Sequence, residues 1–350
     1  MPRFERAILA AMVLVCFAMV SPNAQAQSSA PPALKIGYLL DSLKIERWQT
    51  DVNTFQKRAT ELGAETLVET ADGNDDVQFQ QAQKLLDAGV KSLVIVAHDT
   101  SKAVRIVALA KEKDVPVISY DRLIRDASIA LFVGVNYHEV GRLQAKYLTE
   151  LAPKGNFVLL EGSPADINAH LLREGQEEVL QPLVEHGDIK IVGDVWCTDW
   201  SPLEAYTHMA EIITKSQGQV DAIVASNDGT ATGALQALEE NKLAGKVVVS
   251  GQDADLVAIL RLLQGTQSMT VYKPVLSLAS LAADAAVALA NGQKPKSTST
   301  ISTGDRKVPA ILGSAVVVTK YNILQTVIKD GFQNLDTIKK SLPPEQWPKE

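Results

Sequence analysis

Short apolar runs alternate with longer amphipathic stretches along most of the chain. Lys35–Leu40 is the first such run, and the segment from about Ile45 to Leu62 repeats apolar residues at helical spacing until Gly63 ends it. Short runs separated by helical segments are typical of strands connected by crossover helices. Because such connections join parallel strands, the pattern predicts an α/β fold built from doubly wound parallel sheets.

The expected strands fall into two series that resemble each other. In each series a strand, an acidic residue, a helix, a second strand and an aspartate follow in this order, from Val90 to Arg122 and again from Val220 to Asp253. This repetition favours two similar lobes over one large sheet. The expected strands are Lys35–Leu40, Thr66–Glu69, Ser92–Ala97, Val115–Tyr120 and Leu131–Val135 in the first series, and Asn156–Glu161, Ile189–Val195, Ala222–Ser226, Val247–Ser250 and Met269–Tyr272 in the second.

The chain is expected to pass between the two lobes more than once. The first boundary falls near Tyr137–His138. The helix predicted at Val275–Ala290 has no strand of its own in the second series, so we expect it to return to the first lobe, with Ala315–Thr319 as a final strand in the second. Repeated crossings form a hinge, and a hinge between lobes makes a cleft that can close. The predicted lobes are residues 34–137 with about 274–302, and residues 138–273 with about 303–345.

The N-terminus has the features of an export signal. Arg3 and Arg6 precede the apolar run Ala7–Val20, and Ala24-Gln25-Ala26 fits a cleavage site. The apolar run is shorter than the roughly 20 residues that span a membrane. We therefore expect residues 1–26 to be a signal peptide cleaved near Ala26, followed by a disordered leader over residues 27–33.

Charge and cysteine content exclude several classes of protein. A formal net charge of −7 argues against nucleic acid as a partner. Once the signal peptide is removed, Cys197 is the one cysteine left, so no intramolecular disulfide is possible, and we expect its thiol to be buried. The histidines and Cys197 show no metal-ligand spacing, so we expect neither a metal nor a cofactor.

Polar side chains gather where the predicted strands end. Carboxylates, amides and a guanidinium that end parallel strands should meet at one sheet edge, where α/β proteins bind ligands. Hydroxyl groups both donate and accept hydrogen bonds, and the C–H faces of a sugar ring pack on flat aromatic rings. Trp48 and Trp200 belong to opposite lobes and could stack on opposite faces of one ring. The strand-end residues are Asp121 and Arg122, Asp166 and Asn168, Asn227, and Asp253.

Six segments resemble motifs of the type I periplasmic-binding family, whose members are the substrate-binding components of bacterial ABC importers. The resemblance covers the chain from about Leu34 to Phe332. It implies a monomeric monosaccharide receptor in the periplasm, with D-xylose as the expected sugar and ABC permease subunits as partners. The segments are Glu46-Arg47-Trp48-Gln49, Ser119-Tyr120-Asp121-Arg122, Gly162-Ser163-Pro164-Ala165-Asp166-Ile167-Asn168-Ala169, Ala225-Ser226-Asn227-Asp228, Ser250-Gly251-Gln252-Asp253-Ala254-Asp255 and Val271-Tyr272-Lys273-Pro274.

The resemblance also implies a role for each candidate residue. Trp48 and Trp200 would sandwich the sugar ring. Two departures from the family pattern put the exact sugar in question, because Ile167 stands where asparagine is usual and Asp199 where glycine commonly precedes the stacking tryptophan. The hydroxyl-binding residues would be Arg47, Asp121 and Arg122 from the first lobe, Asp166, Asn168, Asn227 and Asp253 from the second, and Lys273 from a crossing segment.

Several of these residues also have purely structural interpretations. Asp121, Asn168 and Asn227 could cap helices. Arg47 and Arg122 could form surface ion pairs, and Trp48 has the spacing of a core residue. Each structural alternative stays open for a residue taken alone. Together they are less convincing, because all of these side chains are predicted to lie at the same, ligand-binding edge of the two sheets.

An enzymatic function is not expected. The sequence has no Gly-x-Ser-x-Gly elbow, no Walker loop and no histidine paired with a plausible nucleophile. Asp166 and Asp253 could form a glycosidase pair, but nearby arginine and lysine side chains should keep carboxylates ionised. The alternative functions are a binding protein that presents sugar to a chemoreceptor or sensor kinase, and a receptor for another pentose or hexose.

Overall fold

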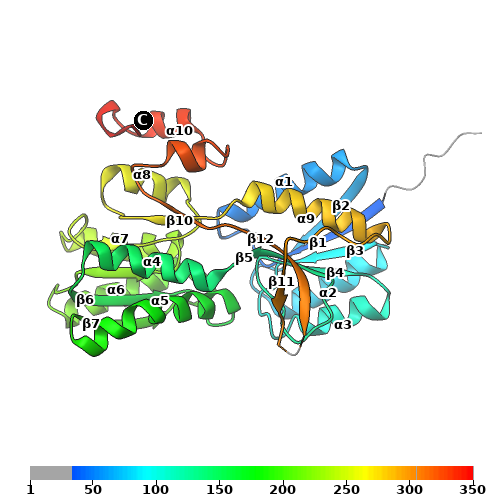
Figure 1. Cartoon of the computed structure of the whole chain (residues 1–350), viewed down its shortest axis with the longest axis horizontal. Helices are drawn as coiled ribbons and strands as arrows, with labels where there is room; N and C mark the ends of the chain where they lie inside the picture. Colours follow the sequence, from blue (N-terminus) through cyan, green and yellow to red (C-terminus); the bar gives the residue numbers. More distant parts are fainter. Residues whose placement is uncertain (1–33, 305, 350) are drawn as a thin grey trace, which may run out of the picture. The chain divides into compact units, whose positions relative to one another are not determined.

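The computed structural model describes residues 34–304 and 306–349. The predicted signal peptide (1–26), its cleavage site near Ala26 and the predicted leader (27–33) lie outside the described residues. The described part of the chain forms one compact unit in which two parallel sheets make the cores of two lobes (Figure 1). No helix within the described ranges is long and apolar enough to cross a membrane.

The first lobe is built on a seven-stranded sheet with the order β11-β12-β5-β4-β3-β1-β2. All neighbouring strands are parallel except β11, which pairs antiparallel with β12. The strands are β1 (Leu34–Leu40), β2 (Ala64–Thr70), β3 (Ser92–Ile95), β4 (Val117–Tyr120), β5 (Leu131–Val135), β11 (Ser299–Ser302) and β12 (Lys307–Gly313).

Helices cover both faces of this sheet because its central strands are apolar on both sides. In β1, Tyr38 belongs to the core cluster that includes α1 and α9, whereas Leu39 belongs to the cluster that includes α2 and α3. Figure 1 shows the two helix pairs on opposite faces. The helices are α1 (Arg47–Glu61), α2 (Asp75–Asp87), α3 (Val104–Glu112) and α9 (Val275–Ala290).

The second lobe has a four-stranded parallel sheet with the order β7-β6-β8-β9. Helices α4 and α5 pack together, as do α6 and α7, and the second pair shares a core cluster with β6 and β8. Cys197 is fully buried in that cluster, as predicted. The elements are α4 (Tyr137–Leu151), β6 (Gly155–Glu161), α5 (Ile167–His186), β7 (Ile189–Trp196), η1 (Thr198–Trp200), α6 (Pro202–Lys215), β8 (Ala222–Ala225), α7 (Asp228–Glu240) and β9 (Val248–Val249).

A small two-stranded sheet follows the second lobe. Its strands pair antiparallel, and the helices beside them close a separate core around Tyr272 and Val318. Together the three sheets confirm the predicted α/β class with two doubly wound lobes. The remaining elements are α8 (Leu256–Gln264), β10 (Thr270–Tyr272), β13 (Val316–Val318), η2 (Leu324–Ile328), α10 (Leu335–Ser341) and η3 (Pro344–Gln346).

One predicted boundary is wrong. The sequence assigned residues from about 303 to the second lobe, but β12 pairs in parallel with β5 of the first lobe, with Ala310 opposite Phe132. The chain therefore leaves the first lobe after Gly313. The misassigned strand is β12, and the error has a physical cause. Its apolar residues mark a strand but do not show which sheet it joins, because its partner β5 lies far earlier in the chain.

Two glycines allow α4 and α5 to approach closely. A Cβ on Gly141 would lie 1.9 Å from the carbonyl oxygen of Leu172, and a Cβ on Gly175 would lie 1.9 Å from that of His138. Each glycine therefore lets one helix contact the backbone of the other. This contact matters for the ligand site, because α4 begins at Tyr137 and α5 presents Asn168 in its first turn.

We expect Gly175→Ala to destabilise the protein, because the added methyl group must push α4 and α5 apart. Overpacking of this kind costs about 1–3 kcal/mol or more. Urea unfolding followed by circular dichroism should show a lower midpoint with an unchanged slope. Glu174→Ala is the matched control on the exposed side of the same helix turn. Equal midpoints for the two variants would contradict the close packing.

Candidate ligand-binding site

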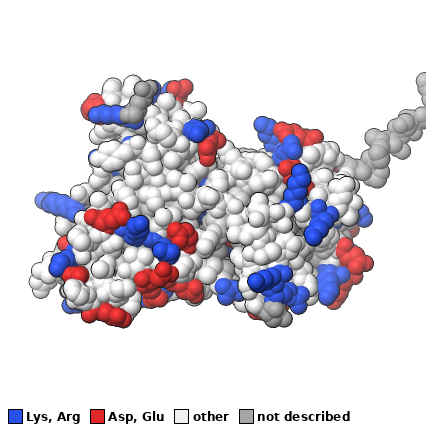
Figure 2. Space-filling view, in the orientation of Figure 1, with Lys and Arg blue, Asp and Glu red and all other residues white. Residues whose placement is uncertain are grey.

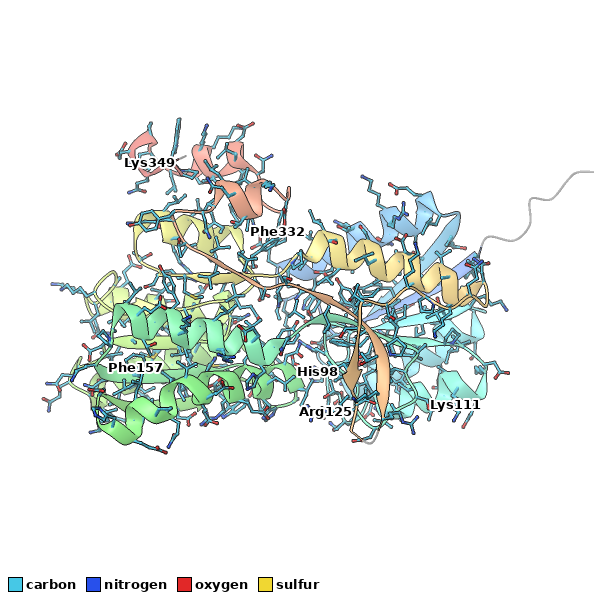
Figure 3. All side chains as sticks on the ribbon, in the orientation of Figure 1. His98, Lys111, Arg125, Phe157, Phe332 and Lys349 are labelled. Atoms are coloured by element: carbon cyan, nitrogen blue, oxygen red, sulfur yellow. The ribbon has the colours of Figure 1, made fainter. Side chains whose placement is uncertain are left out.

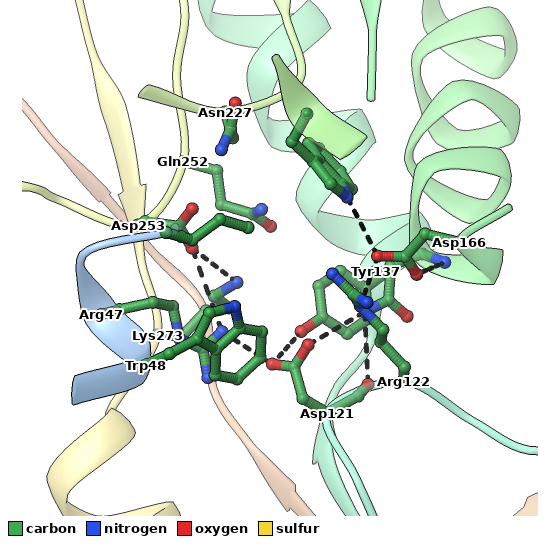
Figure 4. A pocket seen from close by; sticks show the side chains of 13 residues that line it. Arg47, Trp48, Asp121, Arg122, Tyr137, Asp166, Asn227, Gln252, Asp253 and Lys273 are labelled. Carbon is green, nitrogen blue, oxygen red and sulfur yellow. Dashed lines mark hydrogen bonds and ion pairs between the residues drawn. The ribbon is translucent and has the colours of Figure 1, made fainter. Parts of the chain in front are cut away.

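Side chains from both lobes and from a crossing segment line one pocket (Figure 4). The lining includes every residue predicted to bind ligand, so the structure brings the whole predicted set together. Their contact with a ligand stays a prediction. The pocket is lined by Ile45, Arg47, Trp48, Asp121, Arg122, Tyr137, Asp166, Asn168, Trp200, Asn227, Gln252, Asp253 and Lys273.

The lining residues follow the carboxyl ends of the parallel strands, as the rule for α/β sheets requires. Several of them lie where the backbone turns sharply. Asp121 follows β4 with φ 65°, Trp200 ends η1 with φ 59°, and Asp253 follows β9 with φ 101°. Such left-handed conformations cost about 1–3 kcal/mol each in residues other than glycine and cluster at functional sites.

Arg47 lies between two carboxylates in the first lobe. Its Nη1 donates to Asp121 Oδ2 at 2.7 Å, while its Nε and Nη2 both contact the Asp51 carboxylate at 3.1 Å. The guanidinium also packs on the Trp48 ring, 4.2 Å from the centroid. Because Arg47 is buried and bound on both sides, its interpretation as a surface ion pair is wrong.

Arg122 connects the two lobes. Its Nη1 donates to Asp41 Oδ2 at 2.7 Å and to the Ala97 carbonyl oxygen at 2.8 Å, both in the first lobe. Its Nε lies 2.6 Å from Asp166 Oδ2 of the second lobe. All three charged groups are nearly inaccessible to solvent, so Arg122 is not a surface ion pair either.

Asp166 and Asn168 organise the second-lobe side of the pocket. Asp166 caps α5 by accepting from the Asn168 backbone N–H at 2.9 Å, and it also accepts from Trp200 Nε1 at 3.1 Å. Asn168 Nδ2 donates to Asp121 Oδ1 across the cleft at 3.0 Å. The alternative that Asn168 caps the helix is therefore wrong, since Asp166 has that position.

The other capping alternatives have different outcomes. Asn227 does cap α7, with its side chain accepting from the Thr230 N–H at 2.8 Å, and it lines the pocket as well. Asp121 caps no helix, because β5 is the next regular element after it.

Lys273 and Asp253 complete the charged lining. Lys273 Nζ lies 2.8 Å from Asp253 Oδ1, and Arg47 Nη1 lies 3.9 Å from the same oxygen. Each charged lining residue thus has an oppositely charged partner within the protein. Three acids and three bases leave no surplus charge in the lining, which favours an uncharged polar ligand over an anion or a cation.

Among the uncharged side chains of the lining, three buried polar atoms have no hydrogen-bond partner among the described residues: Trp48 Nε1, Asn168 Oδ1 and Gln252 Oε1. Buried polar groups are nearly always hydrogen-bonded. These atoms offer one donor and two acceptors to the pocket. That combination suits hydroxyl groups, which donate and accept through the same oxygen.

Gln144 of α4 supports the second-lobe side from behind. Its Nε2 donates to the carbonyl oxygens of Ala225, Ser226 and Gly251 at 3.1–3.3 Å. These carbonyls lie directly before Asn227 and Gln252, so one buried amide fixes the backbone on which both lining residues stand. A lone glutamine in an amphipathic helix gave no sequence signal of this role.

Sequence reasoning missed Ile45, Tyr137 and Gln252 as lining residues. Tyr137 is the first residue of α4, at the first crossing between lobes, and its hydroxyl donates to Asp121 Oδ2. Gln252 adjoins Asp253, and Ile45 precedes Arg47 by two residues. The signal that could have found Tyr137 was its place at the predicted boundary, because a crossing segment necessarily runs beside the cleft.

The buried carboxyl groups differ in their pKa values. Burial alone would raise the pKa of Asp121, but the charges of Arg47 and Lys273 and the Tyr137 hydrogen bond outweigh it and lower the pKa to about 2. For Asp166, burial dominates and raises the pKa against the opposing charge of Arg122. Basic neighbours therefore lower the pKa at Asp121, whereas at Asp166, one of the two carboxylates considered as a glycosidase pair, burial outweighs the charge of Arg122.

Comparison with known proteins identifies close relatives. Residues 36–294 match the family model of the periplasmic binding protein domain. The chain is 44% identical over 321 residues to the D-xylose-binding periplasmic protein of Escherichia coli K12, covering 92% of this chain and 96% of that protein. It is 43% identical over 305 residues to the protein of the same name from Haemophilus influenzae, covering 87% and 92%.

Solved structures give the same picture. An ABC transporter solute-binding protein from Clostridium phytofermentans with bound β-D-glucose superposes with a TM-score of 0.81 at 28% identity, covering 87% of this chain and all of that one. A carbohydrate transporter solute-binding protein from Chloroflexus aurantiacus in complex with D-glucose also has a TM-score of 0.81, at 29% identity, covering 86% and 97%.

We expect Asp121→Asn to destabilise the folded protein by at least about 2 kcal/mol at pH 7, since the carboxyl pKa is about 2 in the folded state against 3.8 when unperturbed. A carboxyl pKa that is lower in the folded than in the unfolded state stabilises the protein at pH values above the unfolded-state pKa. This contribution to the free energy of unfolding is lost as the pH falls from about 4 to about 2. Chemical unfolding of both proteins across this range should show the difference narrowing in acid.

Asp87→Asn is the control, because it removes a carboxylate whose ion pair with Lys113 is exposed. It should change the free energy of unfolding by less than about 1 kcal/mol. If the difference between wild type and Asp121→Asn stayed constant down to pH 2, the assigned stabilisation of the Asp121 carboxylate would be wrong.

Proposed function

This chain belongs to the periplasmic binding protein family, and on that premise we propose that it is a periplasmic receptor for D-xylose, which it delivers to an ABC permease by closing its two lobes around the sugar. One observation carries the proposal. A single pocket between the lobes combines two indoles with paired acids, bases and amides. The identity to the two D-xylose-binding relatives supports the choice of sugar.

The lining supplies the groups that a small uncharged sugar needs. Arg47, Arg122 and Lys273 donate hydrogen bonds, the carboxylates accept them, and Asn168 and Asn227 do both. Hydrogen bonds from charged groups are about twice as strong as neutral ones. Trp48 and Trp200 come from opposite lobes, so in our proposal each covers one face of the ring. Both indoles line the same pocket, which supports this arrangement.

Closure of the cleft follows from the division of the binding side chains between the two lobes. Sugar in an open cleft touches one lobe, whereas a closed cleft lets both lobes contact it, so binding favours the closed state. The hinge has three crossings, between β5 and α4, between β10 and α9, and between β12 and β13. Several short crossing segments allow the lobes to rotate as rigid bodies while the two sheets keep their packing.

Surface charge is compatible with a small-molecule receptor. On the face shown in Figure 2, basic and acidic side chains are interspersed over both lobes. That face has no extended basic patch of the kind that draws nucleic acids. Within the described ranges, no three or more His, Cys, Asp or Glu side chains lie close enough together to hold a metal ion.

Isothermal titration calorimetry with purified protein tests the proposal. We expect D-xylose to bind with a Kd in the micromolar range or tighter, about −8 kcal/mol or stronger. D-glucose, D-ribose, L-arabinose and D-galactose serve as the comparison set, because they differ from D-xylose by a hydroxymethyl group, a hydroxyl orientation or both. Absence of heat with every sugar would refute the receptor function, and tighter binding of another sugar would refute the choice of D-xylose.

Asp253→Ala tests one assigned role. Removing this carboxylate leaves Lys273 without its partner and takes an acceptor from the pocket, so we expect Kd for D-xylose to rise at least thirtyfold, by about 2 kcal/mol or more. The exposed Asp87→Ala should bind like wild type. Binding of Asp253→Ala within about twofold of wild type, with the fold intact by circular dichroism, would show that Asp253 does not bind the sugar.

A further inference from the structure

Asp199 has an unusual backbone conformation beside the pocket. It lies in the middle of the η1 turn with φ 52° and ψ 26°, and the next residue, Trp200, is also left-handed. Two successive non-glycine residues in this conformation are costly and persist only where surrounding contacts hold them. The turn aims the Trp200 ring at the pocket and leaves the Asp199 carboxylate at its mouth.

The Asp199 carboxylate reaches across the cleft to the first lobe. Its Oδ2 lies 3.5 Å from Lys44 Nζ, and its Oδ1 lies 3.9 Å from His98 Nε2. His98 lies on the side of the first lobe that faces the second (Figure 3). Gly73 leaves room for the approach, since a Cβ there would lie 3.3 Å from Asp199 Oδ2.

These contacts continue into the binding site. His98 Nδ1 is 2.9 Å from Asp41 Oδ1, and Asp41 Oδ2 accepts from Arg122 Nη1 at 2.7 Å. Arg122 in turn lies 2.6 Å from Asp166, which accepts from Trp200 Nε1. A continuous series of polar contacts therefore leaves the second lobe at Asp199 and returns to it at Asp166, next to the neighbouring Trp200.

We propose that Asp199 is a latch residue that holds the lobes together after the sugar has entered and positions Trp200 on the ring, so that it slows sugar release. The inference rests on the proposed sugar-receptor function and adds a positioning residue to it. Asp199 contacts Lys44 and His98 only while the cleft is closed, so its attraction stabilises the closed state selectively.

The expected size of the effect follows from exposure. The side chains of Lys44 and Asp199 are 58% and 36% exposed, and ion pairs of this kind are worth little individually. The His98 contact is more enclosed, since that side chain is 14% exposed. Together they predict a threefold to tenfold effect on the release rate. Because both contacts form at closure, the association rate should change little.

The His98 contact depends on protonation. The neutral ring that donates from Nδ1 to Asp41 presents a lone pair at Nε2, which repels the Asp199 carboxylate, whereas the protonated ring attracts it. Asp41, Asp75 and Asp199 all face His98, and the Asp41 hydrogen bond together with these charges raises the pKa of His98 above 6.5 despite its partial burial. The latch should therefore weaken as the pH rises through that raised value.

Stopped-flow tryptophan fluorescence can measure release of D-xylose from wild type and variants. Asp199→Asn keeps the shape of the side chain and tolerates the left-handed backbone, while Asp199→Gly also relieves the strain. We expect both variants to release sugar threefold to tenfold faster, and wild type to release it faster at pH 8 than at pH 6. Asp199→Asn should lose most of this pH dependence. Added salt should accelerate release from wild type more than from Asp199→Asn.

Glu46→Gln is the matched control, because Glu46 is an exposed acid at the first-lobe rim of the same cleft mouth. It removes the same charge, but what it removes across the cleft is a repulsion of Asp255 and no attraction, so it should release sugar no faster than wild type. A release rate unchanged in both Asp199 variants would overturn the latch while leaving the receptor function intact. Equal acceleration in Glu46→Gln would also overturn it, because the effect would then be one of general charge.

A failure of the proposed function has a different signature. If wild type binds none of the sugars, the receptor proposal falls, and the latch is judged without ligand by small-angle X-ray scattering. A larger radius of gyration for Asp199→Asn than for wild type and Glu46→Gln would then support the latch. Equal radii for all three proteins would overturn it.

Discussion

Burial of opposite charges in one cleft is the constraint on which the rest of this structure depends. An unpaired charge in a protein interior costs several kcal/mol, so every acid in the pocket must lie beside a base. Arg47 meets this requirement within the first lobe, between Asp51 and Asp121, whereas Arg122 meets it by bonding Asp41 in one lobe and Asp166 in the other. The apposition of the lobes is therefore part of the electrostatics of the site. A ligand that enters must be rich in hydrogen-bonding groups and free of net charge, because the lining has no net charge that could neutralise a charged ligand.

Much of the fold could be predicted because local pattern and tertiary structure agree. β1 and α9 lie where apolar spacing put them, since parallel strands buried on both faces are apolar throughout and an alanine-rich helix has no competing structure. The edge strand β11 could not be predicted in the same way. Its Ser and Thr side chains are exposed, and what holds it is pairing with β12, a contact between segments that carries no local apolar signal. The error in the lobe boundary has a related cause, because the partner of β12 is β5, far earlier in the chain, and the apolar residues of β12 do not show which sheet it joins.

The candidate site was predictable for a related reason, and its gaps have an equally physical origin. Asp121, Asp166 and Asp253 follow strands, and the strand ends of a doubly wound sheet converge whatever the sequence between them. Whether a given polar residue caps a helix or faces the pocket depends on one turn of backbone. Asp166 rather than Asn168 caps α5 because its extended backbone, with φ −101° and ψ 117°, lets the carboxylate reach the free N–H groups of the first turn. Gln144 acts from a neighbouring helix, and that spatial relation is absent from the order of residues.

The strained positions explain why the pocket needs the rigid lobes behind it. Asp121, Trp200 and Asp253 all adopt left-handed conformations that an isolated loop would relax. Each is held by contacts from elsewhere: Asp121 by Arg47 and Tyr137, Trp200 by its bond to Asp166, and Asp253 by a backbone N–H that donates to the Val271 carbonyl oxygen at 2.9 Å. The strain is thus offset by packing that the fold provides before any ligand arrives. Side chains held in this way lose little conformational entropy when a ligand binds. Less of the free energy of each hydrogen bond to the ligand is therefore offset, and more of it contributes to affinity.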